Sequence, residues 1–377
     1  MGFLLSGVLA ITWKQLAMYA IGALLIYLAI KKDFEPAFLL PMGFGAILVN
    51  IPFSGVLDQM EPVPAHGIIQ WLFETTISAS EALPILLFIG IGAMIDFGPL
   101  LSNPKMMIFG AAAQFGIFFT LSLATLLGFS LTDAACIGII GAADGPTSIL
   151  VSQVFQSPYM GAIAVAAYSY MALVPIIQPF AIRLVTTKKE RRIHMPYNPK
   201  SISKSTRILF PIIVTFIAGL VAPMSVSLVG FLMFGNLLRE CGVLNSLSQT
   251  AQNEFANIIT LLLGLTISFS MQAESFIRWE TIMIMCLGLV AFVFDSIGGV
   301  LFAKLMNLFL KEKINPMIGA AGISAFPMSA RVIQKIALSE DKQNHLLMHA
   351  IGANVSGQIG SVIAGGIILN LIPQLVK

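Results

Sequence analysis

Long apolar stretches separated by short polar ones run through almost the whole chain. The stretches that approach or exceed the roughly 20 residues of a membrane-spanning helix cover 14–30, 82–102, 106–129, 159–185, 208–222, 255–272, 281–310 and 346–372. Shorter or interrupted apolar stretches lie near 36–52, 133–156, 225–238 and 315–337. The pattern predicts an all-α polytopic membrane protein, in which the short, Gly- or Pro-interrupted stretches are the first places to search for a site.

The two halves of the chain resemble each other in sequence. In order, Pro36–Phe44 matches Pro223–Phe231, Pro84–Phe97 matches Ile258–Phe269, Gly141–Gln153 matches Gly319–Gln334, and Tyr168–Tyr170 matches Asn354–Ser356. The offset stays at about 175–190 residues throughout. We predict two structural repeats, over about 14–186 and 206–376, whose broken helices near 133–156 and 315–337 meet near the membrane midplane. We expect the repeats to be inverted, which depends on whether the short segments cross the membrane or re-enter it.

Composition agrees with a membrane protein and sets its orientation. Only 10% of the residues are charged and 57% are hydrophobic, whereas a soluble domain carries about 25% charged residues. Basic residues gather between Lys188 and Arg207, where acids are scarce, and the positive-inside rule places such a stretch in the cytoplasm. We therefore expect an N-terminal membrane repeat over 1–186, a basic cytoplasmic loop over 187–207 and a C-terminal membrane repeat over 208–377.

Several function classes find no support in the sequence. The net charge of +3 is too small to indicate a nucleic-acid partner. The three cysteines are far apart and form no disulfide framework. The sequence has no P-loop, so ATP-driven pumping by this chain alone is unsupported. His345 and His349 have helical i,i+4 spacing but no obvious third metal ligand, and we interpret them as helix-surface or interface histidines.

The first interrupted stretch carries a carboxylate at its break. Apolar residues run up to Asp144, Gly145-Pro146 follow, and apolar residues resume at Ile149. An ionised side chain at the bilayer centre costs roughly 3 kcal/mol or more, so it marks a functional site by default. We expect Gly145-Pro146 to stop the helix and Asp144 to bind Na⁺ or, in exchange, a proton. The alternative is that Asp144 only caps the helix that Pro146 begins.

Polar residues of the following helix and of the second half are further candidates. The Tyr170 hydroxyl is a candidate proton relay or cation ligand, or else an aromatic packing residue with a satisfied O–H. In the second interrupted stretch we expect Asn315-Pro316 to open a helix and Phe326-Pro327 to break it. Ser324 would offer an oxygen there. Arg331 would hold a carboxylate ligand, unless its side chain only extends to the interface.

The last long stretch carries polar residues in the middle of a helix. Asn354 and Ser356 are candidate ion ligands, and Asn354 is favoured because its place in the repeat lies opposite the Asp144 half. The alternative is that the Gly and Ser spacing in this stretch serves close helix packing. Asp96 and Asp295 are further carboxylates within apolar stretches, but neither sits at a helix break, so we rank them below Asp144.

The chain resembles the β subunits of the Na⁺-translocating biotin-dependent decarboxylases, which act on oxaloacetate, glutaconyl-CoA, methylmalonyl-CoA or malonate. The resemblance spans essentially the whole chain and is most specific at Gly141–Ser148, Asn315–Arg331 and Gly352–Gly357. It implies a subunit that decarboxylates carboxybiotin at the cytoplasmic face of a prokaryotic inner membrane, moves Na⁺ outward and consumes a proton. The competing class is a Na⁺- or H⁺-coupled secondary transporter of a small organic anion, because repeats and broken helices do not specify a driving force.

The resemblance also implies partners and roles for particular residues. The partners would be a biotin carrier that supplies carboxybiotin, a carboxyltransferase α subunit, a small γ or δ membrane subunit and further copies of this chain in a homo-oligomer such as a trimer. The resemblance matches the family's functional positions to Asp144, Tyr170, Asn315, Gly319, Ser324, Arg331 and Asn354. We expect Na⁺ at Asp144 and Asn354, with Asn315, Ser324 and Ser356 as further ion-binding residues. Gly145, Pro146 and Gly319 would shape the site. As a mechanism, we expect a proton that passes along Tyr170 and Asp144 to displace Na⁺ and reach carboxybiotin.

Overall fold

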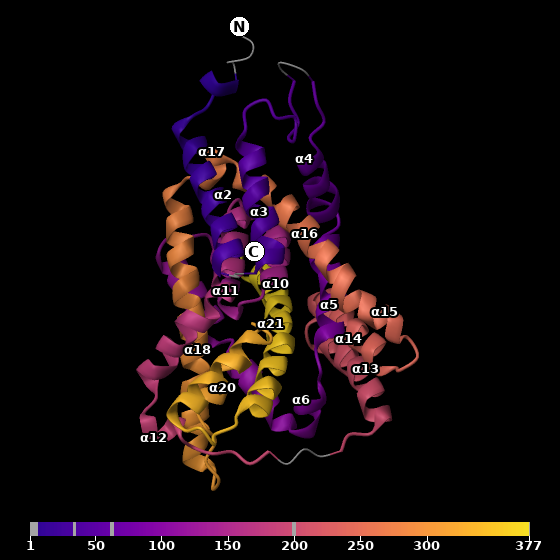
Figure 1. The fold of residues 1–377 in the computed structure, drawn as a ribbon, viewed down its shortest axis with the longest axis vertical. Helices are drawn as coiled ribbons and strands as arrows, with labels where there is room; N and C mark the ends of the chain where they lie inside the picture. Colours follow the sequence, from indigo (N-terminus) through magenta and orange to yellow (C-terminus); the bar gives the residue numbers. More distant parts are fainter. Residues whose placement is uncertain (1–6, 33–34, 61–63, 198–200, 377) are drawn as a thin grey trace.

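A computed structural model describes residues 7–32, 35–60, 64–197 and 201–376, and it is almost entirely helical (Figure 1). Residues 198–200 of the expected basic loop lie outside the described residues, as do 1–6, 33–34 and 61–63 of the expected N-terminal repeat and residue 377 of the C-terminal one. The described part of the chain has an isolated β-bridge between Gln59 and Ala65 but no strand. The fold is therefore all-α, as the hydrophobic pattern predicts.

The helical elements run in chain order from α2 to α21, and η denotes a 3₁₀ or π segment. The first half contains α2 (Trp13–Lys32), α3 (Pro36–Asn50), α4 (Ile68–Phe73), η1 (Glu74–Ser78), α5 (Ala82–Met94), α6 (Gly98–Ser102), η2 (Pro104–Met106), α7 (Met107–Ala112), α8 (Phe115–Leu126), α9 (Leu131–Gly138), η3 (Ile139–Ala142), α10 (Gly145–Val154) and α11 (Met160–Val185). The remainder contains α12 (Lys188–Arg191), α13 (Lys204–Val221), η4 (Pro223–Ser225), α14 (Val226–Glu240), α15 (Asn245–Thr250), η5 (Ala251–Phe255), α16 (Ala256–Ile267), η6 (Ser268–Met271), α17 (Ala273–Phe276), α18 (Trp279–Phe309), α19 (Met317–Ala320), α20 (Met328–Glu340) and α21 (Leu347–Val376).

Six of these helical stretches are long and apolar enough to cross a membrane within the described residues, and two bent pairs raise the number to eight. The six cover Trp13–Lys32, Pro104–Leu126, Lys204–Val221, Asn245–Met271, Trp279–Phe309 and Leu347–Val376. Apolar side chains such as Phe216 and Leu220 on α13 lie exposed, which suits a lipid-facing surface and would be costly in water. The chain is thus built as a multi-pass membrane protein.

Two expected spans are interrupted, and each interruption has a local cause. The stretch over 82–102 leaves the helix at Met94, where the Asp96 carboxylate accepts a hydrogen bond of 2.8 Å from Gly98 N–H in a tight turn before α6. The stretch over 159–185 forms α11, which bends by 71° between Met171 and Leu173. Pro175 lacks an N–H for the carbonyl one turn earlier, at Met171, and its ring crowds that carbonyl.

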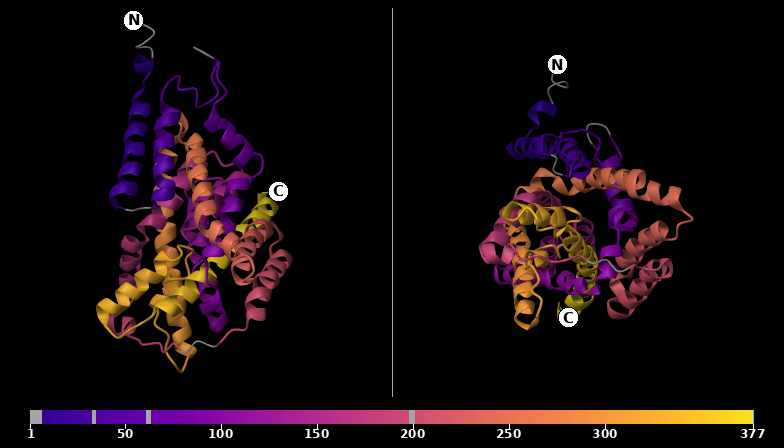
Figure 2. Two further views of the ribbon diagram at one scale, coloured as in Figure 1. Left: turned by 45° about the vertical axis from the view of Figure 1, so that its right-hand side comes forward. Right: turned by 60° about the horizontal axis from the view of Figure 1, so that its bottom comes forward.

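The helices pack into two bundles, and each bundle combines elements from both halves of the chain (Figures 1 and 2). In the first bundle, α3 packs against α2 and α16, and α5 packs against α14 and α16. In the second bundle, α18 packs against α8 and α11, and α21 packs against α7 and α20. Gly92 of α5 and Gly235 of α14 let the two backbones touch, because a Cβ at either position would strike the carbonyl of the partner helix.

The basic loop is anchored to the lower end of the second bundle in Figure 1. The Arg191 Nε–Glu340 Oε1 distance is 2.8 Å, and both side chains are largely buried. Asn315 donates hydrogen bonds of 2.9 Å from its side-chain amide to the carbonyls of Arg191 and Ile193. Asn344 donates to the same two carbonyls. These contacts fix the first part of the loop against α20 and the residues before α19.

Candidate functional site

The first interrupted stretch forms α9, η3 and α10, and the chain leaves the helix at Ala143 and Asp144. Ala143 adopts the left-handed region with φ of 53°, and Asp144 is extended with φ of −125°. Gly145 and Pro146 then begin α10 instead of stopping a helix, which corrects the expectation from the sequence. Proline is favoured in a first helical turn because its missing N–H has no partner to lose there. The break therefore lies just before Gly145-Pro146.

Asp144 is the N-cap of α10, and its buried carboxylate accepts hydrogen bonds from neutral donors. Oδ1 lies 3.3 Å from Thr147 N, while Oδ2 lies 2.7 Å from Thr147 Oγ1 and 2.8 Å from Ser361 Oγ. The residue is 4% exposed, and no ion pair reaches it from the described residues. Hydroxyls orient a carboxylate but do not neutralise its charge, so a buried Asp144 requires a cation or a proton as partner.

The second interrupted stretch approaches the first through its own break. After α19 ends at Ala320, the chain is irregular until α20 starts at Met328, one residue past the expected Phe326-Pro327 break. Within this segment Ser324 N donates a hydrogen bond of 2.9 Å to the Ala142 carbonyl, directly before the Asp144 break. Ser324 Oγ donates to the Gly357 carbonyl of α21 at 2.9 Å. Two segments far apart in sequence thus meet at their non-helical points.

One face of α21 lines both breaks. Asn354, Gln358 and Ser361 follow i, i+4, i+7 spacing and so share a face of the helix. The Asn354 amide donates to the Ile323 carbonyl at 2.6 Å, Gln358 donates to the Ser324 carbonyl, and Ser361 donates to Asp144. The Asn354 side-chain oxygen has no hydrogen-bond partner among the described residues, although it is fully buried. A buried oxygen without a donor is a natural ligand for a cation or an ordered water.

A cavity of about 350 Å³ opens beside Asp144, where the two bundles meet. Its lining comes from the N-cap of α3, from α5, from both breaks, from α11 and from α21: Glu35, Leu87, Ile91, Met94, Ala143, Asp144, Gly145, Pro146, Tyr168, Met171, Ser324, Phe326, Pro327 and Gln358. The absence of a side chain at Gly145 makes room for the Tyr168 ring, because a Cβ there would overlap that ring. The cavity is mostly apolar, and Asp144 and Glu35 are the carboxylates among its described lining residues.

Three residues of this site were not chosen from the sequence. Tyr168 is buried, its hydroxyl has no hydrogen-bond partner among the described residues, and its ring stacks on Phe38. Glu35 adds a second carboxylate to the lining, and Ser361 contacts Asp144 directly. The i,i+4,i+7 spacing of Asn354, Gln358 and Ser361 was a signal that could have identified Ser361, whereas the sequence carries no comparable signal for Glu35.

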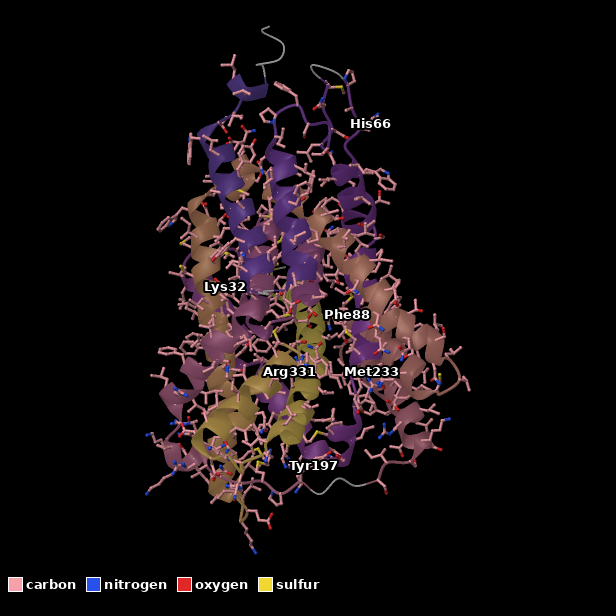
Figure 3. The ribbon with its side chains drawn as sticks, viewed as in Figure 1. Lys32, His66, Phe88, Tyr197, Met233 and Arg331 are labelled. Carbon is pink, nitrogen blue, oxygen red and sulfur yellow. The ribbon has the colours of Figure 1, made fainter. Side chains whose placement is uncertain are left out.

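The other candidates lie outside the cavity lining. The Tyr170 hydroxyl donates to the Met285 carbonyl of α18, and Ser356 Oγ donates to the Met106 carbonyl at 2.9 Å. Asn315 holds the basic loop through the contacts described above. Gly319 lets α19 and α18 touch at Gly299, since a Cβ on either glycine would strike the other backbone. Arg331 is exposed on α20, one turn after Pro327 of the cavity lining (Figure 3).

The two additional carboxylates also occupy local structures of their own. Asp295 of α18 is fully buried, and its Oδ1 accepts a hydrogen bond of 3.2 Å from Ile117 N in the first turn of α8. Its Oδ2 has no hydrogen-bond partner within the described part of the chain. Asp96 shapes the turn before α6. Asp295 therefore stabilises the α8 N-terminus, and both carboxylates lie outside the lining of the Asp144 cavity.

The donor set around Asp144 fits a small hard cation. Carboxylate and hydroxyl oxygens are ligands of such ions, and Asp144, Ser324 and Tyr168 bring these groups to the cavity lining. Asn354 lies outside that lining, one turn before Gln358 on α21. No cluster of three or more His, Cys, Asp or Glu residues that could hold a metal ion occurs in the described chain. Oxygen donors suit hard cations, whereas nitrogen and sulfur ligands suit transition metals.

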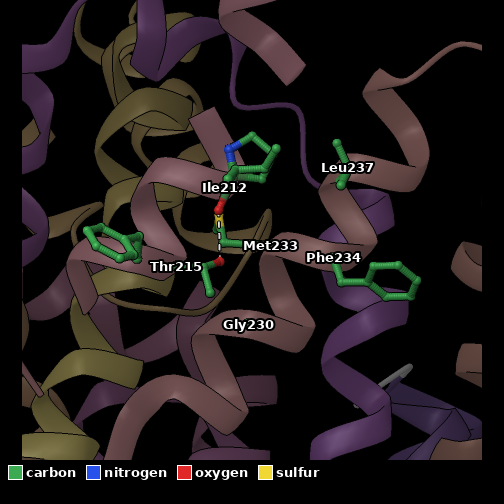
Figure 4. Close-up of a pocket in the computed structure, with 8 residues that line it drawn as sticks. Ile212, Thr215, Gly230, Met233, Phe234 and Leu237 are labelled. Carbon is green, nitrogen blue, oxygen red and sulfur yellow. Dashed lines mark hydrogen bonds between the residues drawn. The ribbon is translucent and has the colours of Figure 1, made fainter. Parts of the chain in front are cut away.

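A further cavity illustrates what a purely packing-related space looks like in this fold. It lies between α13 and α14, has a volume of about 360 Å³ and is lined almost entirely by apolar groups such as Ile212, Met233 and Phe234 (Figure 4). The Thr215 hydroxyl in its wall is already bonded to the Pro211 carbonyl at 2.8 Å. Thr215 is the one polar side chain among the described residues that line this cavity, whereas the lining of the Asp144 cavity includes carboxylates.

Comparison with known proteins gives a consistent result over the whole chain. A family described as the Na⁺-transporting oxaloacetate decarboxylase beta subunit matches residues 14–372. The glutaconyl-CoA decarboxylase subunit beta of Acidaminococcus fermentans is 47% identical over 367 residues, covering 97% of this chain and 96% of that protein. The methylmalonyl-CoA decarboxylase subunit beta of Propionigenium modestum is 46% identical, with 97% of each chain covered. The oxaloacetate decarboxylase beta chain of Klebsiella pneumoniae is 43% identical, with 95% of each covered.

Proposed function

Because the chain belongs to the family of membrane β subunits of Na⁺-transporting decarboxylases, we propose that Asp144 is the ion-coupling residue at which it exchanges Na⁺ for a proton. In this family the β subunit decarboxylates carboxybiotin and transports Na⁺ across the inner membrane. The observation that carries the proposal is the buried Asp144 carboxylate, oriented by Thr147 and Ser361 without a cationic partner among the described residues. Na⁺ and a proton are interchangeable partners for such a group.

The proposed reaction balances with one proton. The bond between the ureido nitrogen of carboxybiotin and its carboxylate carbon breaks, and CO₂ leaves. The bonding electron pair remains on the nitrogen, which takes up the proton and becomes biotin. In our proposal this proton comes from the site at Asp144, and Na⁺ is released from the same site. Moving one charge against 100 mV costs about 2.3 kcal/mol, so release of CO₂ and movement of Na⁺ must be tightly coupled.

The residues of the site take different parts in this proposal. Asp144 binds the ion, Asn354 and Ser324 supply further oxygens, and the Tyr168 hydroxyl faces the same cavity. Tyr170 remains a candidate on the strength of the family resemblance, while its bond to Met285 favours a role in holding α11 against α18. Arg331 remains a candidate for attracting the carboxylate of carboxybiotin, since it is exposed near the cavity.

The partners in the proposal follow from its chemistry. As a β subunit, the chain works within a multi-subunit complex, and we propose that these partners are a biotin carrier, a carboxyltransferase and a small membrane subunit. The relatives serve glutaconyl-CoA, methylmalonyl-CoA and oxaloacetate decarboxylases at similar identities to this chain. The identity of the acid is therefore a property of the carboxyltransferase in our proposal.

The test is CO₂ release from free carboxybiotin by the purified full chain, with and without Na⁺. We expect Na⁺ to stimulate release, and Asp144→Asn to abolish the stimulation. Asp133→Asn is the matched control, because Asp133 lies near the surface at the start of α9 and bonds to Ser130 and Ser157 outside the cavity. Full Na⁺-stimulated activity in Asp144→Asn would refute the assignment. Uptake of an organic anion by vesicles containing the chain, without CO₂ release, would favour a secondary transporter instead.

A further inference from the structure

A second polar cavity lies at the end of the molecule that carries the basic loop. It has a volume of about 600 Å³, within the range of about 300–1,000 Å³ of small-molecule sites. It is formed by the turn around η2, the loop residues 195–197, the C-terminal end of α18 and the first turn of α21. Tyr197, labelled at the lower end of the molecule in Figure 3, belongs to its wall. We call it the loop-end cavity.

The rim of the loop-end cavity has an excess of positive charge. Lys105 and Lys311 are exposed side chains in its lining, and Glu312 is the one acidic residue among its described lining residues. Two lysines at an opening attract an anion and raise its local concentration. The rim therefore favours a ligand with a negatively charged group.

The interior of the loop-end cavity offers an unpaired nitrogen. His349 of α21 is 7% exposed, and its Nε2 has no hydrogen-bond partner among the described residues. The Tyr197 ring meets the imidazole edge-on, with ring centroids 5.4 Å apart. A buried polar nitrogen without a partner costs free energy that a hydrogen-bonding ligand would recover. The cavity thus combines an anion-attracting rim with a buried hydrogen-bonding group.

Part of the lining of the loop-end cavity is apolar and adaptable. Met106, Phe109 and Met306 contribute to it, and methionine side chains adjust readily to the shape of a ring. A fitting ligand would therefore carry a carboxylate, a hydrogen-bonding group beside it and a small apolar ring. That combination describes the carboxylated ureido ring of biotin with its fused thioether ring.

We infer that the loop-end cavity is the docking site for the carboxylated ring of carrier-borne biotin, an inference that rests on the proposed function. Lys105 and Lys311 attract the carboxylate, His349 bonds to the ureido group, and the methionine wall receives the thioether ring. The basic loop, which the positive-inside rule places in the cytoplasm, brings this cavity to the side from which a soluble carrier would approach.

The position of the loop-end cavity has a consequence for coupling. Gln358 of the Asp144 cavity follows His349 by nine residues on the same helix, which is about 14 Å at 1.5 Å per residue. A ring docked at His349 would therefore not touch Asp144, and the proton released from Asp144 would have to reach the ureido nitrogen through intervening water. The helix α21 connects the two cavities, and Ser356 between them bonds to the carbonyl of Met106 in the loop-end cavity. Coupling would thus pass through α21.

The test compares kinetic constants of the full chain in nanodiscs with free carboxybiotin as substrate. We expect the double variant Lys105→Gln/Lys311→Gln to raise the KM for carboxybiotin at least tenfold and to leave the Na⁺ concentration for half-maximal activity unchanged. His349→Phe should raise the same KM. His349→Gln keeps a hydrogen-bonding nitrogen and should therefore leave the KM close to its wild-type value. Lys335→Gln is the matched control, because Lys335 is an exposed lysine of α20 outside the cavity lining.

The outcomes separate this inference from the proposed function. An unchanged KM for carboxybiotin in the double lysine variant, or an equal rise of that KM in Lys335→Gln, would overturn the docking site. The proposed function would still stand in that case if the wild-type chain shows Na⁺-dependent CO₂ release. A rise in KM with Arg331→Gln alone would place docking at Arg331 and also overturn it. Absence of Na⁺-dependent CO₂ release by the wild-type chain would overturn the proposed function and this inference together.

Discussion

At Asp144, two hydroxyl groups converge on one carboxylate oxygen from different halves of the chain. Thr147 belongs to the helix that Asp144 caps, whereas Ser361 comes from α21. A hydroxyl that donates to a carboxylate favours its ionised form. The ionised form is the one that binds Na⁺, so these donors set the balance between Na⁺ and a proton.

The first prediction concerns Ser361. A hydrogen bond to a charged group contributes about 1.5–3 kcal/mol, so Ser361→Ala should raise the Na⁺ concentration for half-maximal CO₂ release about tenfold or more. Ser152→Ala is the control, because Ser152 is likewise a buried serine but bonds to the Ser148 carbonyl of α10 and not to Asp144. Equal Na⁺ requirements in the two variants would contradict the role of Ser361.

The second prediction separates the two tyrosines of α11. Tyr168→Phe removes a hydroxyl that faces the Asp144 cavity without a partner in the described part of the protein, so it should raise the Na⁺ requirement severalfold and leave thermal stability nearly unchanged. Tyr170→Phe removes the hydrogen bond to Met285, so it should lower the free energy of unfolding by about 1 kcal/mol and leave the Na⁺ requirement unchanged. The opposite pattern would assign the ion-linked hydroxyl to Tyr170, as the family resemblance implies.

The tyrosines also show what the sequence could and could not predict at this scale. Asp144 stands out because a carboxylate in an apolar stretch is costly, and Asn354 stands out through its place in the repeat. Tyr168 and Tyr170, by contrast, lie two residues apart and so about 200° apart around a helix. The helix around them is apolar on all sides, so the sequence does not indicate which face meets the cavity. Tertiary packing decides that choice.

At the scale of elements, the sequence located both interrupted stretches but placed the first break on the wrong side of Gly145-Pro146. Proline is compatible both with ending one helix and with beginning the next. Asp144 resolves the ambiguity in the structure, because its side chain accepts from Thr147 N as an N-cap. Asp144 thus does cap α10, and in our proposal the same carboxylate also binds the ion.

The third prediction concerns the short helix α12 and its contact with α20. Arg191 bonds to Glu340 and, through the same guanidinium, to the Thr186 carbonyl at 2.6 Å. Removing one partner of a buried pair leaves the other charge uncompensated, at a cost of about 3 kcal/mol. Arg191→Ala should therefore release the loop from α20 and speed amide hydrogen exchange at 187–197.

The neighbouring residue provides the control for this prediction. Arg192 is exposed, and its Nε bonds to the Glu340 carbonyl at 3.1 Å. An exposed contact of this kind contributes little, so Arg192→Ala should leave hydrogen exchange of the loop nearly unchanged. If both variants behaved alike, the Arg191–Glu340 pair would not be what holds the loop.

At the scale of the whole molecule, the packing pairs agree with the repeats inferred from sequence. The matched blocks relate α3 to α14 and α5 to α16, and the observed pairs are α3 with α16 and α14 with α5. Exchanging the two repeats turns one pair into the other, as a two-fold relation requires. This reciprocity supports, as a proposal, two repeats related by a two-fold axis.

The Asp144 cavity lies where the two bundles meet, which leads to the last prediction. The first bundle contributes Leu87 and Ile91 of α5, and the second contributes Tyr168 of α11 and Phe326 beside the second break. If the bundles move against each other to expose Asp144 to either side in turn, a link between them should stop transport. We predict that Ile91→Cys/Phe326→Cys, joined by a short thiol cross-linker in a background without the native cysteines, loses Na⁺ transport.

A link within one bundle is the matched control for that experiment. Ala93 of α5 and Leu238 of α14 pack together in the first bundle, so Ala93→Cys/Leu238→Cys joined by the same reagent should keep Na⁺ transport. The two pairs share helix α5 and differ in whether the link crosses between the bundles. Because α5 is tied to a neighbour in both cases, loss of transport in the first pair alone would locate the movement at the boundary that contains Asp144. Equal transport in both linked proteins would mean that the ion reaches Asp144 without relative movement of the bundles.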